Sequence, residues 1–149
     1  PGLSLAIWNL IASTGAENYV RKKTLIIGKS DIFTQPTRKI LSDKGMEEPT
    51  IVHPSDRELA DKIRAADILI TAVGKPRTVS ADMVKDGAII IDVGISSVDG
   101  QTVGDVDFKN VAPKTSYITP VPGGVGPMTV AMLLYNTLQL SKERKRARP

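Results

Sequence analysis

The sequence contains no cysteine and a single histidine, His53. The lack of cysteine excludes disulfides, thiolate chemistry and cysteine-bound zinc, and it fits a reducing compartment, so we expect a cytoplasmic protein. One histidine does not make a histidine-rich metal site, and we expect no bound metal. Any chemistry must therefore come from other side chains, from the backbone or from a cofactor.

The sequence also lacks a long hydrophobic run. Its longest apolar stretches cover residues 3–12 and 130–140, and both fall short of the roughly 20 residues that cross a bilayer. No basic residues precede the first stretch and no small-residue cleavage site follows it, which argues against a secretory signal. We therefore expect no membrane partner.

The positive charge is confined to the carboxyl-terminal tail. The net charge of the chain is +4, and the five basic residues of the tail, set against Glu143, account for all of it. A terminal basic run is typical of a solvated helix end, where cations suit the negative end of the helix dipole. We therefore expect no nucleic-acid partner. The basic residues of the tail are Lys142, Arg144, Lys145, Arg146 and Arg148.

The length of the chain indicates one domain. With 149 residues, of which 41% are hydrophobic, the chain buries about two thirds of its unfolded surface on folding. No internal repeat or linker divides it, so we expect a single domain over residues 1–149. Because the first residue is Pro1 rather than methionine, we expect this domain to belong to a longer protein.

Short aliphatic and β-branched runs alternate with helical patterns. Leu3, Ile7, Leu10 and Ile11 recur at helical spacing, and Gly15 follows as a helix stop. Strands that are apolar throughout are typical of a parallel sheet covered on both faces. The fold class is therefore α/β, a doubly wound, mostly parallel, Rossmann-like sheet. The expected strands are residues 24–27, 50–52, 67–71, 88–92 and 117–119, and the later expected helices are a stretch between 36 and 45, 58–65, a turn near 82–84, and 129–144.

The loops that follow the strands are the candidate binding elements, because ligands of such sheets lie at the carboxyl ends of the strands. Gly28, Lys29 and Ser30 follow the first strand and supply a tight turn, a cation and a hydroxyl. They suit the adenosine end or pyrophosphate of a dinucleotide, although the full glycine-rich fingerprint is missing and a plain turn remains an alternative.

The second strand ends without an acidic residue. It runs into His53, Pro54 and Ser55, whereas sheets that prefer NAD usually place a carboxylate here for the ribose 2′-hydroxyl. A 2′-phosphate needs donors and positive charge instead, which Lys29 and Ser55 supply. For His53 two interpretations stay open, a half-buried, hydrogen-bonded histidine and a group near the adenine.

Glycines also follow the third and fourth strands. Gly74 and Gly94 occupy equivalent places in the pattern, and glycine lets a ring or a ribose approach the backbone closely. Glycine is also ordinary turn chemistry. Two such glycines in register favour a ligand groove.

A stiff loop precedes the last helix. Residues 119–129 contain three prolines and three glycines, which fix unusual backbone angles. We expect Thr129 to cap the helix, with its hydroxyl facing a ligand at the helix start.

The run from Pro120 to Thr129 resembles the signature of the bifunctional methylenetetrahydrofolate dehydrogenase/cyclohydrolase family. Residues 88–95 and 103–106 resemble stretches of that family in the same order and at similar spacing. The likeness covers nearly the whole chain and places it at the family's carboxyl-terminal NAD(P)-binding domain. It implies an NADP cofactor, with NAD left open, the substrates methylenetetrahydrofolate and methenyltetrahydrofolate, and a homodimer.

The resemblance also implies roles for individual residues. Gly28, Lys29 and Ser30 would hold the adenosine ribose and its phosphate. Ile95 and Thr129 would line the nicotinamide, and Gly126, Pro127 and Val130 would touch the folate's side of the cleft. The expected cofactor-binding residues are Gly28, Lys29, Ser30, His53, Ser55, Gly74, Gly94, Ile95 and Thr129, and the expected substrate-binding residues are Gly126, Pro127 and Val130.

Three positions depart from the family pattern. Lys29 stands where the family often has arginine, Thr34 where it usually has glycine, and Pro54 where many members have serine or arginine for the 2′-phosphate. The family's catalytic tyrosine-x-x-x-lysine motif belongs to an earlier domain. Tyr19 and Lys23 share that spacing but lead directly into the first strand, so we expect no catalytic residue in this chain.

Two other functions remain open. The chain could be a stand-alone, non-catalytic nucleotide-binding or regulatory domain, or it could bind anions or nucleic acid through the basic tail. An upstream catalytic domain would separate the first alternative from the enzyme, and the salt dependence of polyanion binding would test the second.

Overall fold

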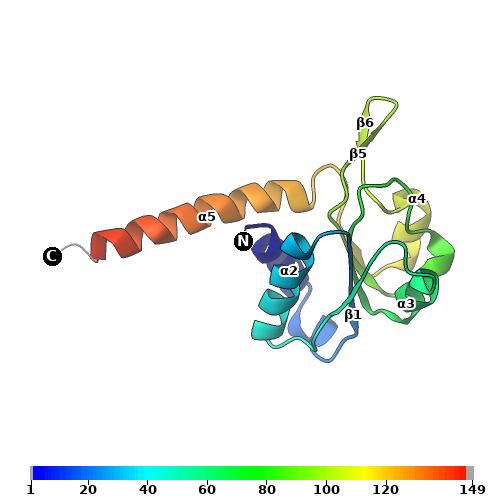
Figure 1. Ribbon diagram of the computed structural model, residues 1–149, viewed down its shortest axis with the longest axis horizontal. Helices are drawn as coiled ribbons and strands as arrows, with labels where there is room; N and C mark the ends of the chain where they lie inside the picture. Colours follow the sequence, from blue (N-terminus) through cyan, green and yellow to red (C-terminus); the bar gives the residue numbers. More distant parts are fainter. Residues whose placement is uncertain (1, 147–149) are drawn as a thin grey trace.

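A computed structural model of the chain describes residues 2–146, with backbone alone for residues 16, 145 and 146. Five parallel strands form the central sheet in the order β2-β1-β3-β4-β7 (Figure 1). This confirms the expected doubly wound α/β fold. The strands are β1 (Thr24–Gly28), β2 (Thr50–Val52), β3 (Ile68–Ala72), β4 (Ile89–Asp92) and β7 (Tyr117–Ile118).

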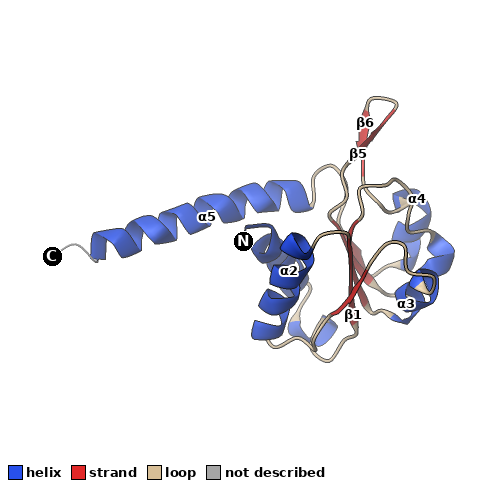
Figure 2. Cartoon of the chain, in the orientation of Figure 1, coloured by secondary structure: helices blue, strands red, loops and turns tan. Residues whose placement is uncertain are grey.

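Helices cover both faces of the sheet (Figure 2). On one face, Ile7 and Ile11 of α1 (Gly2–Ala12) and Leu41 of α2 (Asp31–Asp43) pack against the sheet. The opposite face carries a second apolar cluster, which takes in Ile63 of α3 (Leu59–Ala65) and Val111 of α4 (Phe108–Val111). Burial on both faces is what the continuous aliphatic strands require. Short 3-10 turns complete the fold at Ala16–Asn18, Ala81–Met83 and Ala112–Lys114.

Helix α2 begins earlier than the sequence pattern predicted. A polar loop was expected up to Pro36, but the helix starts at Asp31, and the Ser30 side chain accepts a hydrogen bond from the Ile32 amide at 3.3 Å. Pro36 lies inside the helix. The capping hydroxyl of Ser30 was present in the sequence as a start signal, and the proline masked it.

Helix α5 (Val125–Arg146) also begins earlier than expected. Thr129 is therefore not its N-cap, and its hydroxyl donates a hydrogen bond to the Val125 carbonyl at 2.8 Å. The first turns of α5 pack closely on α1, since a Cβ on Gly2 would lie 2.8 Å from Leu133 Cδ2. Figure 1 shows the rest of α5 extending beyond the body of the domain. The basic tail continues this helix, with Lys142 and Arg144 exposed, and Arg148 lies outside the described residues.

A small antiparallel hairpin was not predicted. It consists of β5 (Ser96–Val98) and β6 (Gln101–Val103), and its turn holds Asp99 and Gly100 at positive φ. In Figure 1 the hairpin projects from the edge of the domain. It follows β4 directly, so it stands beside the carboxyl ends of the strands. Within residues 2–146, no helix is long and apolar enough to span a membrane.

Replacing Pro36 should stabilise the protein. Proline has no amide hydrogen, so the Ile32 carbonyl lacks its helical partner in α2. We expect Pro36→Ala to raise the free energy of unfolding by about 1–3 kcal/mol, measured by urea denaturation. The control is Pro113→Ala, at the start of the Ala112–Lys114 turn, where the missing amide costs little. A Pro36→Ala protein no more stable than wild type would contradict this account.

Candidate functional site

The carboxyl ends of the parallel strands form one edge of the domain. Ile27 pairs with Val52, Gly28 with Ala72, and Thr71 with Asp92. The loops that carry Gly28, Gly74 and Gly94 therefore open at the same edge, as expected. The chain passes from β1 to β2 on one side of β1 and then returns to β3 on the other. Such a reversal of strand order opens a crevice for a ligand between the strand ends.

The turn after β1 packs tightly against helix α2. A Cβ on Gly28 would lie 2.7 Å from the Thr34 methyl group, so glycine lets the strand end meet the helix. Ser30 caps α2. Lys29 is exposed, and among the described residues its ammonium has no ion-pair partner. The turn thus presents a cation at the edge, next to the amino terminus of a helix.

The turn after β2 ties His53 to Ser55. The Ser55 amide donates a hydrogen bond to His53 Nδ1 at 3.2 Å, and the Ser55 hydroxyl lies 2.6 Å from the same nitrogen. Nδ1 is therefore the acceptor, and the neutral ring carries its proton on Nε2. His53 is exposed rather than half-buried. Its Nε2 proton and Lys29 both lie at the adenosine end of the edge predicted from the sequence.

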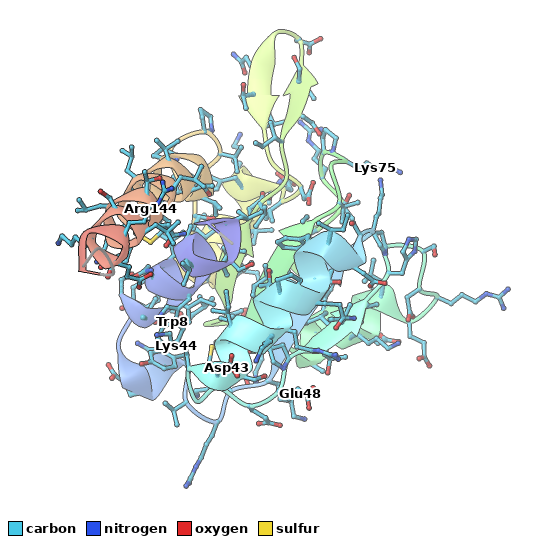
Figure 3. The ribbon with its side chains drawn as sticks, turned by 60° about the vertical axis from the view of Figure 1, so that its left-hand side comes forward. Trp8, Asp43, Lys44, Glu48, Lys75 and Arg144 are labelled. Carbon is cyan, nitrogen blue, oxygen red and sulfur yellow. The ribbon has the colours of Figure 1, made fainter. Side chains whose placement is uncertain are left out.

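Asp105 binds the loop after β3. Its side chain is fully buried. One oxygen accepts hydrogen bonds from the Val73 amide at 2.7 Å and the Thr71 hydroxyl at 2.9 Å. The other accepts from the Gly74 and Lys75 amides at 2.9 and 3.1 Å. These amides point inward to a carboxylate, so they are not free to bind a phosphate. Figure 3 shows the Lys75 side chain extending outward from this loop.

Asp92 binds the loop after β4 and the segment that carries Asp105. It is 3% exposed. Its carboxylate accepts hydrogen bonds from the amides of Gly94 (2.9 Å), Asp105 (3.1 Å) and Val106 (3.0 Å). Burial and, to a lesser extent, the charge of Asp105 raise the pKa of Asp92 against the opposing effect of the three amides, and the net result is a pKa of about 6. Its own amide donates to the Thr119 hydroxyl at 2.9 Å, which links the network to the end of β7.

Two glycines make room for these carboxylates. A Cβ on Gly94 would collide with the Asp105 carboxylate, and one on Gly104 would collide with Asp92. Gly94 was expected from the sequence to admit a ligand, but the space that a side chain would need there is filled by Asp105. At Gly74 a Cβ would meet nothing within 4 Å, so lack of space does not require glycine there. Its backbone φ of +71°, which other residues rarely adopt, does require it.

A cleft of about 510 Å³ opens beside Asp92. Its walls come from the loop after β4, the β5–β6 hairpin, the proline- and glycine-rich loop, the start of α5, and Leu3 of α1. It brings together six of the residues predicted to bind cofactor or substrate, namely Gly94, Ile95, Gly126, Pro127, Thr129 and Val130. Most of its lining is apolar, so it excludes water from a flat ring better than it holds a charge.

The other predicted residues lie outside this cleft. Gly28, Lys29 and Ser30 follow β1, His53 and Ser55 follow β2, and Gly74 follows β3. Along this edge the loop after β3 is nearest to β4, the loop after β1 is next, and the loop after β2 is furthest away. An elongated ligand with one polar and one apolar end fits this arrangement.

Sequence reasoning missed the hydrogen-bonding roles of Asp92, Asp105 and Thr119. A charged residue that ends an otherwise aliphatic strand, as Asp92 does, was the available signal. A buried carboxylate at such a position needs donors, and loop amides are the nearest ones.

The fold and the edge define a Rossmann-like dinucleotide-binding domain. The chain matches the family described as "Tetrahydrofolate dehydrogenase/cyclohydrolase, NAD(P)-binding domain" over residues 1–145, and it belongs to that family. It is 51% identical over 123 residues to the bifunctional protein FolD of Sulfurihydrogenibium sp. (strain YO3AOP1), covering 83% of this chain and 43% of that protein. It is 47% identical over 148 residues to FolD of Protochlamydia amoebophila (strain UWE25), covering 93% and 50%.

Solved structures give the same result. The FolD methylenetetrahydrofolate dehydrogenase/cyclohydrolase of Campylobacter jejuni superposes with a TM-score of 0.89 at 42% identity, covering 97% of this chain and 51% of that one. The Trypanosoma brucei enzyme, complexed with NADP and an inhibitor, gives 0.89 at 38% identity, covering 99% and 52%. The chain thus spans about half the length of the relatives it matches.

The buried Asp92 should give stability a distinctive pH dependence. Its folded-state pKa of about 6 lies above the ordinary value of 3.8. Between these values the folded protein binds more protons than the unfolded chain, so the free energy of unfolding falls as pH rises from about 4 to about 6. We expect this fall, on the order of 1–3 kcal/mol, to be absent in Asp92→Asn, measured by urea denaturation at each pH.

The difference between wild type and variant isolates this effect. Asp56, Asp67 and Asp82 have lowered pKa values, so their contributions are lost only as pH falls below about 4, and they are common to both proteins. An Asp92→Asn protein with the same slope as wild type between pH 4 and 6 would contradict the assignment.

Proposed function

We propose that this chain is the dinucleotide-binding part of an NADP-dependent methylenetetrahydrofolate dehydrogenase that also has methenyltetrahydrofolate cyclohydrolase activity. The observation that carries the proposal is the edge itself, on which an exposed cation at β1 and an apolar cleft at β4 lie along one line of strand ends. The family to which the chain belongs supports the same function. The lack of cysteine fits a cytoplasmic location.

The dinucleotide would lie along the edge with its adenosine end at β1 and β2. Lys29 and the His53–Ser55 pair would bind the ribose and its phosphate there. The nicotinamide would enter the cleft beside Gly94 and Ile95, where it would supply the hydride acceptor. Ile95 is 71% exposed and Val130 59% exposed, so bound rings would cover apolar surface that is now in water.

The folate would approach the opposite wall of the cleft. Gly126 and Pro127 lie in the first turn of α5, where glycine leaves the backbone open, since a Cβ on Gly126 would meet nothing within 4 Å. Thr129 is held by its bond to the Val125 carbonyl and so presents its methyl group and backbone at a fixed position. In this proposal the domain contributes position and exclusion of water, and it contributes no acid–base group.

Helix α5 offers a surface for the rest of the protein. It carries large apolar side chains that are more than half exposed, namely Val130, Leu133, Leu134, Tyr135, Leu138 and Leu140. Such a patch indicates contact with further protein. The relatives are about twice as long as this chain, and we propose that their other half covers α5 and brings the catalytic lysine to the cleft.

The chain alone should bind dinucleotide but not turn over. We expect no detectable oxidation of methylenetetrahydrofolate by the 149-residue chain, because the proposed acid–base lysine belongs to the other domain, and we expect turnover once a relative's catalytic domain is joined to it. Dinucleotide binding by calorimetry is the control for folding. Turnover by the isolated chain would show that the lysine is not needed, whereas binding without restored turnover would favour a regulatory nucleotide-binding domain.

The domain should also form a homodimer through a sheet edge. Strand β7 is an edge strand of two residues, and the first of them, Tyr117, is 47% exposed. Pairing with the same edge of a second copy would satisfy its free backbone groups. We expect a dimer by sedimentation at tens of micromolar and a monomer for Tyr117→Lys, with Val20→Lys, at another exposed position, as control. A monomeric wild type would contradict this proposal.

NADP should bind more tightly than NAD, mainly because of Lys29. No carboxylate stands at the tip of β2, where it could accept a 2′-hydroxyl or repel a 2′-phosphate, and the register of β1 and β2 brings the two turns to adjacent positions. A charged hydrogen bond of this kind contributes about 1.5–3 kcal/mol, or roughly ten- to a hundredfold in affinity. We expect Lys29→Ala to weaken NADP by this factor and to leave NAD nearly unchanged, measured by calorimetry.

A lysine at the far end of α2 provides the control. Lys39 is exposed and paired with Asp43, so Lys39→Ala removes the same charge without touching the edge. Equal weakening of NAD and NADP by Lys29→Ala, or a wild type that prefers NAD, would contradict the assignment of Lys29.

A further inference from the structure

Burying two carboxylates costs free energy, which is unusual in a domain of this size. Asp105 is fully buried and Asp92 is 3% exposed, and within the described residues neither forms an ion pair with a lysine or arginine. Removing a carboxylate from water is costly unless donors replace the water. Here six backbone amides and one hydroxyl replace it. A core built for stability alone would use apolar side chains at both positions.

All of these donors lie at the carboxyl edge of the sheet. The Asp105 carboxylate accepts hydrogen bonds from the amides of Val73, Gly74 and Lys75 after β3. The Asp92 carboxylate accepts one from the amide of Gly94 after β4. Asp92 also accepts from the Asp105 amide, which joins the two halves into one network. No other pair of side chains in the described part of the chain bonds so many loop amides at this edge.

The network also reaches the proline- and glycine-rich loop. The Asp92 amide donates to the hydroxyl of Thr119, the residue between the end of β7 and Pro120. Asp92 itself lines the 510 Å³ cleft and a neighbouring cavity of about 200 Å³ that also includes Arg77 and Asp107. The two carboxylates therefore fix the loops after β3 and β4 relative to each other, and the backbone amide of Asp92 ties Thr119 to the same place.

We propose that Asp92 and Asp105 are positioning residues for dinucleotide binding, and that their carboxylates hold the loops after β3 and β4 in the arrangement that the bound dinucleotide requires. This inference rests on the proposed function. It assigns no contact with the ligand to either side chain. The ionised form of Asp92 is the competent one, because a proton on the carboxylate would add a donor where three amides already donate.

The affinity of the 149-residue chain for a dinucleotide tests the proposal. NAD is the probe, since it lacks the 2′-phosphate that would titrate near neutral pH. At pH 8 we expect Asp92→Asn and Asp105→Asn each to weaken NAD about tenfold or more, on the scale of one lost charged hydrogen bond. The matched control is Thr37→Val, which removes a buried hydrogen bond to Ser4 between α1 and α2, away from the edge. It should lower stability and leave the affinity within about twofold.

The pH profile separates positioning from general stability. As pH falls from 8 to 5, we expect the wild-type affinity for NAD to fall toward that of Asp92→Asn, while the wild-type free energy of unfolding rises. The Asp92→Asn profile should be flat. The charged groups around Asp92 are Asp105, Arg77 and Asp107. As a further control the series is repeated in His53→Gln, which replaces the single histidine, and the wild-type slope should persist there.

Aspartate variants that bind NAD as wild type does, a Thr37→Val protein weakened as much as they are, or a wild-type affinity independent of pH would each overturn the proposal. If the asparagine variants fail to fold, Thr71→Val, which removes one donor to Asp105, and the wild-type pH profile still decide it. A wild type that binds no dinucleotide at either pH would instead contradict the proposed function.

Discussion

The fold depends on a parallel sheet that is buried on both of its faces. Its strands are aliphatic along their middles, and helices from α1 to α4 cover them. Polar chemistry has no place on either face, because an unpaired polar group there would be costly. The ends of the strands are then the only part of the sheet where polar groups, glycines and loops can gather. The site lies at the carboxyl edge for that reason, and so do the two buried aspartates.

Elements set by local pattern were predictable from the sequence. Strand β3 shows this, since a run of aliphatic residues bounded by polar ones has few other structures open to it. The start of α2 was not predicted, because Pro36 suggests a boundary and Ser30 gives the true one. Thr129 was expected to cap α5 on the strength of its hydroxyl, yet the helix begins at Val125, and the hydroxyl bonds within the helix. The Asp99-Gly100 pair was an available hairpin signal.

The candidate site likewise has a part that could be predicted from the sequence and a part that could not. Glycines at strand ends and the loop of prolines and glycines are visible locally, and the residues of that loop do line one cleft with Gly94 and Ile95. The carboxylate network was not predictable, because Asp92 and Asp105 become partners only when β4 and the segment after β6 are brought together. Gly94 illustrates the difference. The sequence shows that a glycine stands at this position. The reason that glycine is needed there is the Asp105 side chain packed against it, which is a tertiary contact.

The contact between Gly28 and Thr34 links two positions of the sequence. Only one of them has room for a methyl group, since a Cβ on Gly28 would lie 2.7 Å from the Thr34 methyl carbon. Thr34 is 1% exposed and the helix around it is fixed by its cap, so neither side of the contact can retreat. Where a relative has glycine at the second position, that space is open. In the course of divergence the two sites are therefore expected to covary: an alanine can enter at 28 only in a lineage that has first shortened 34.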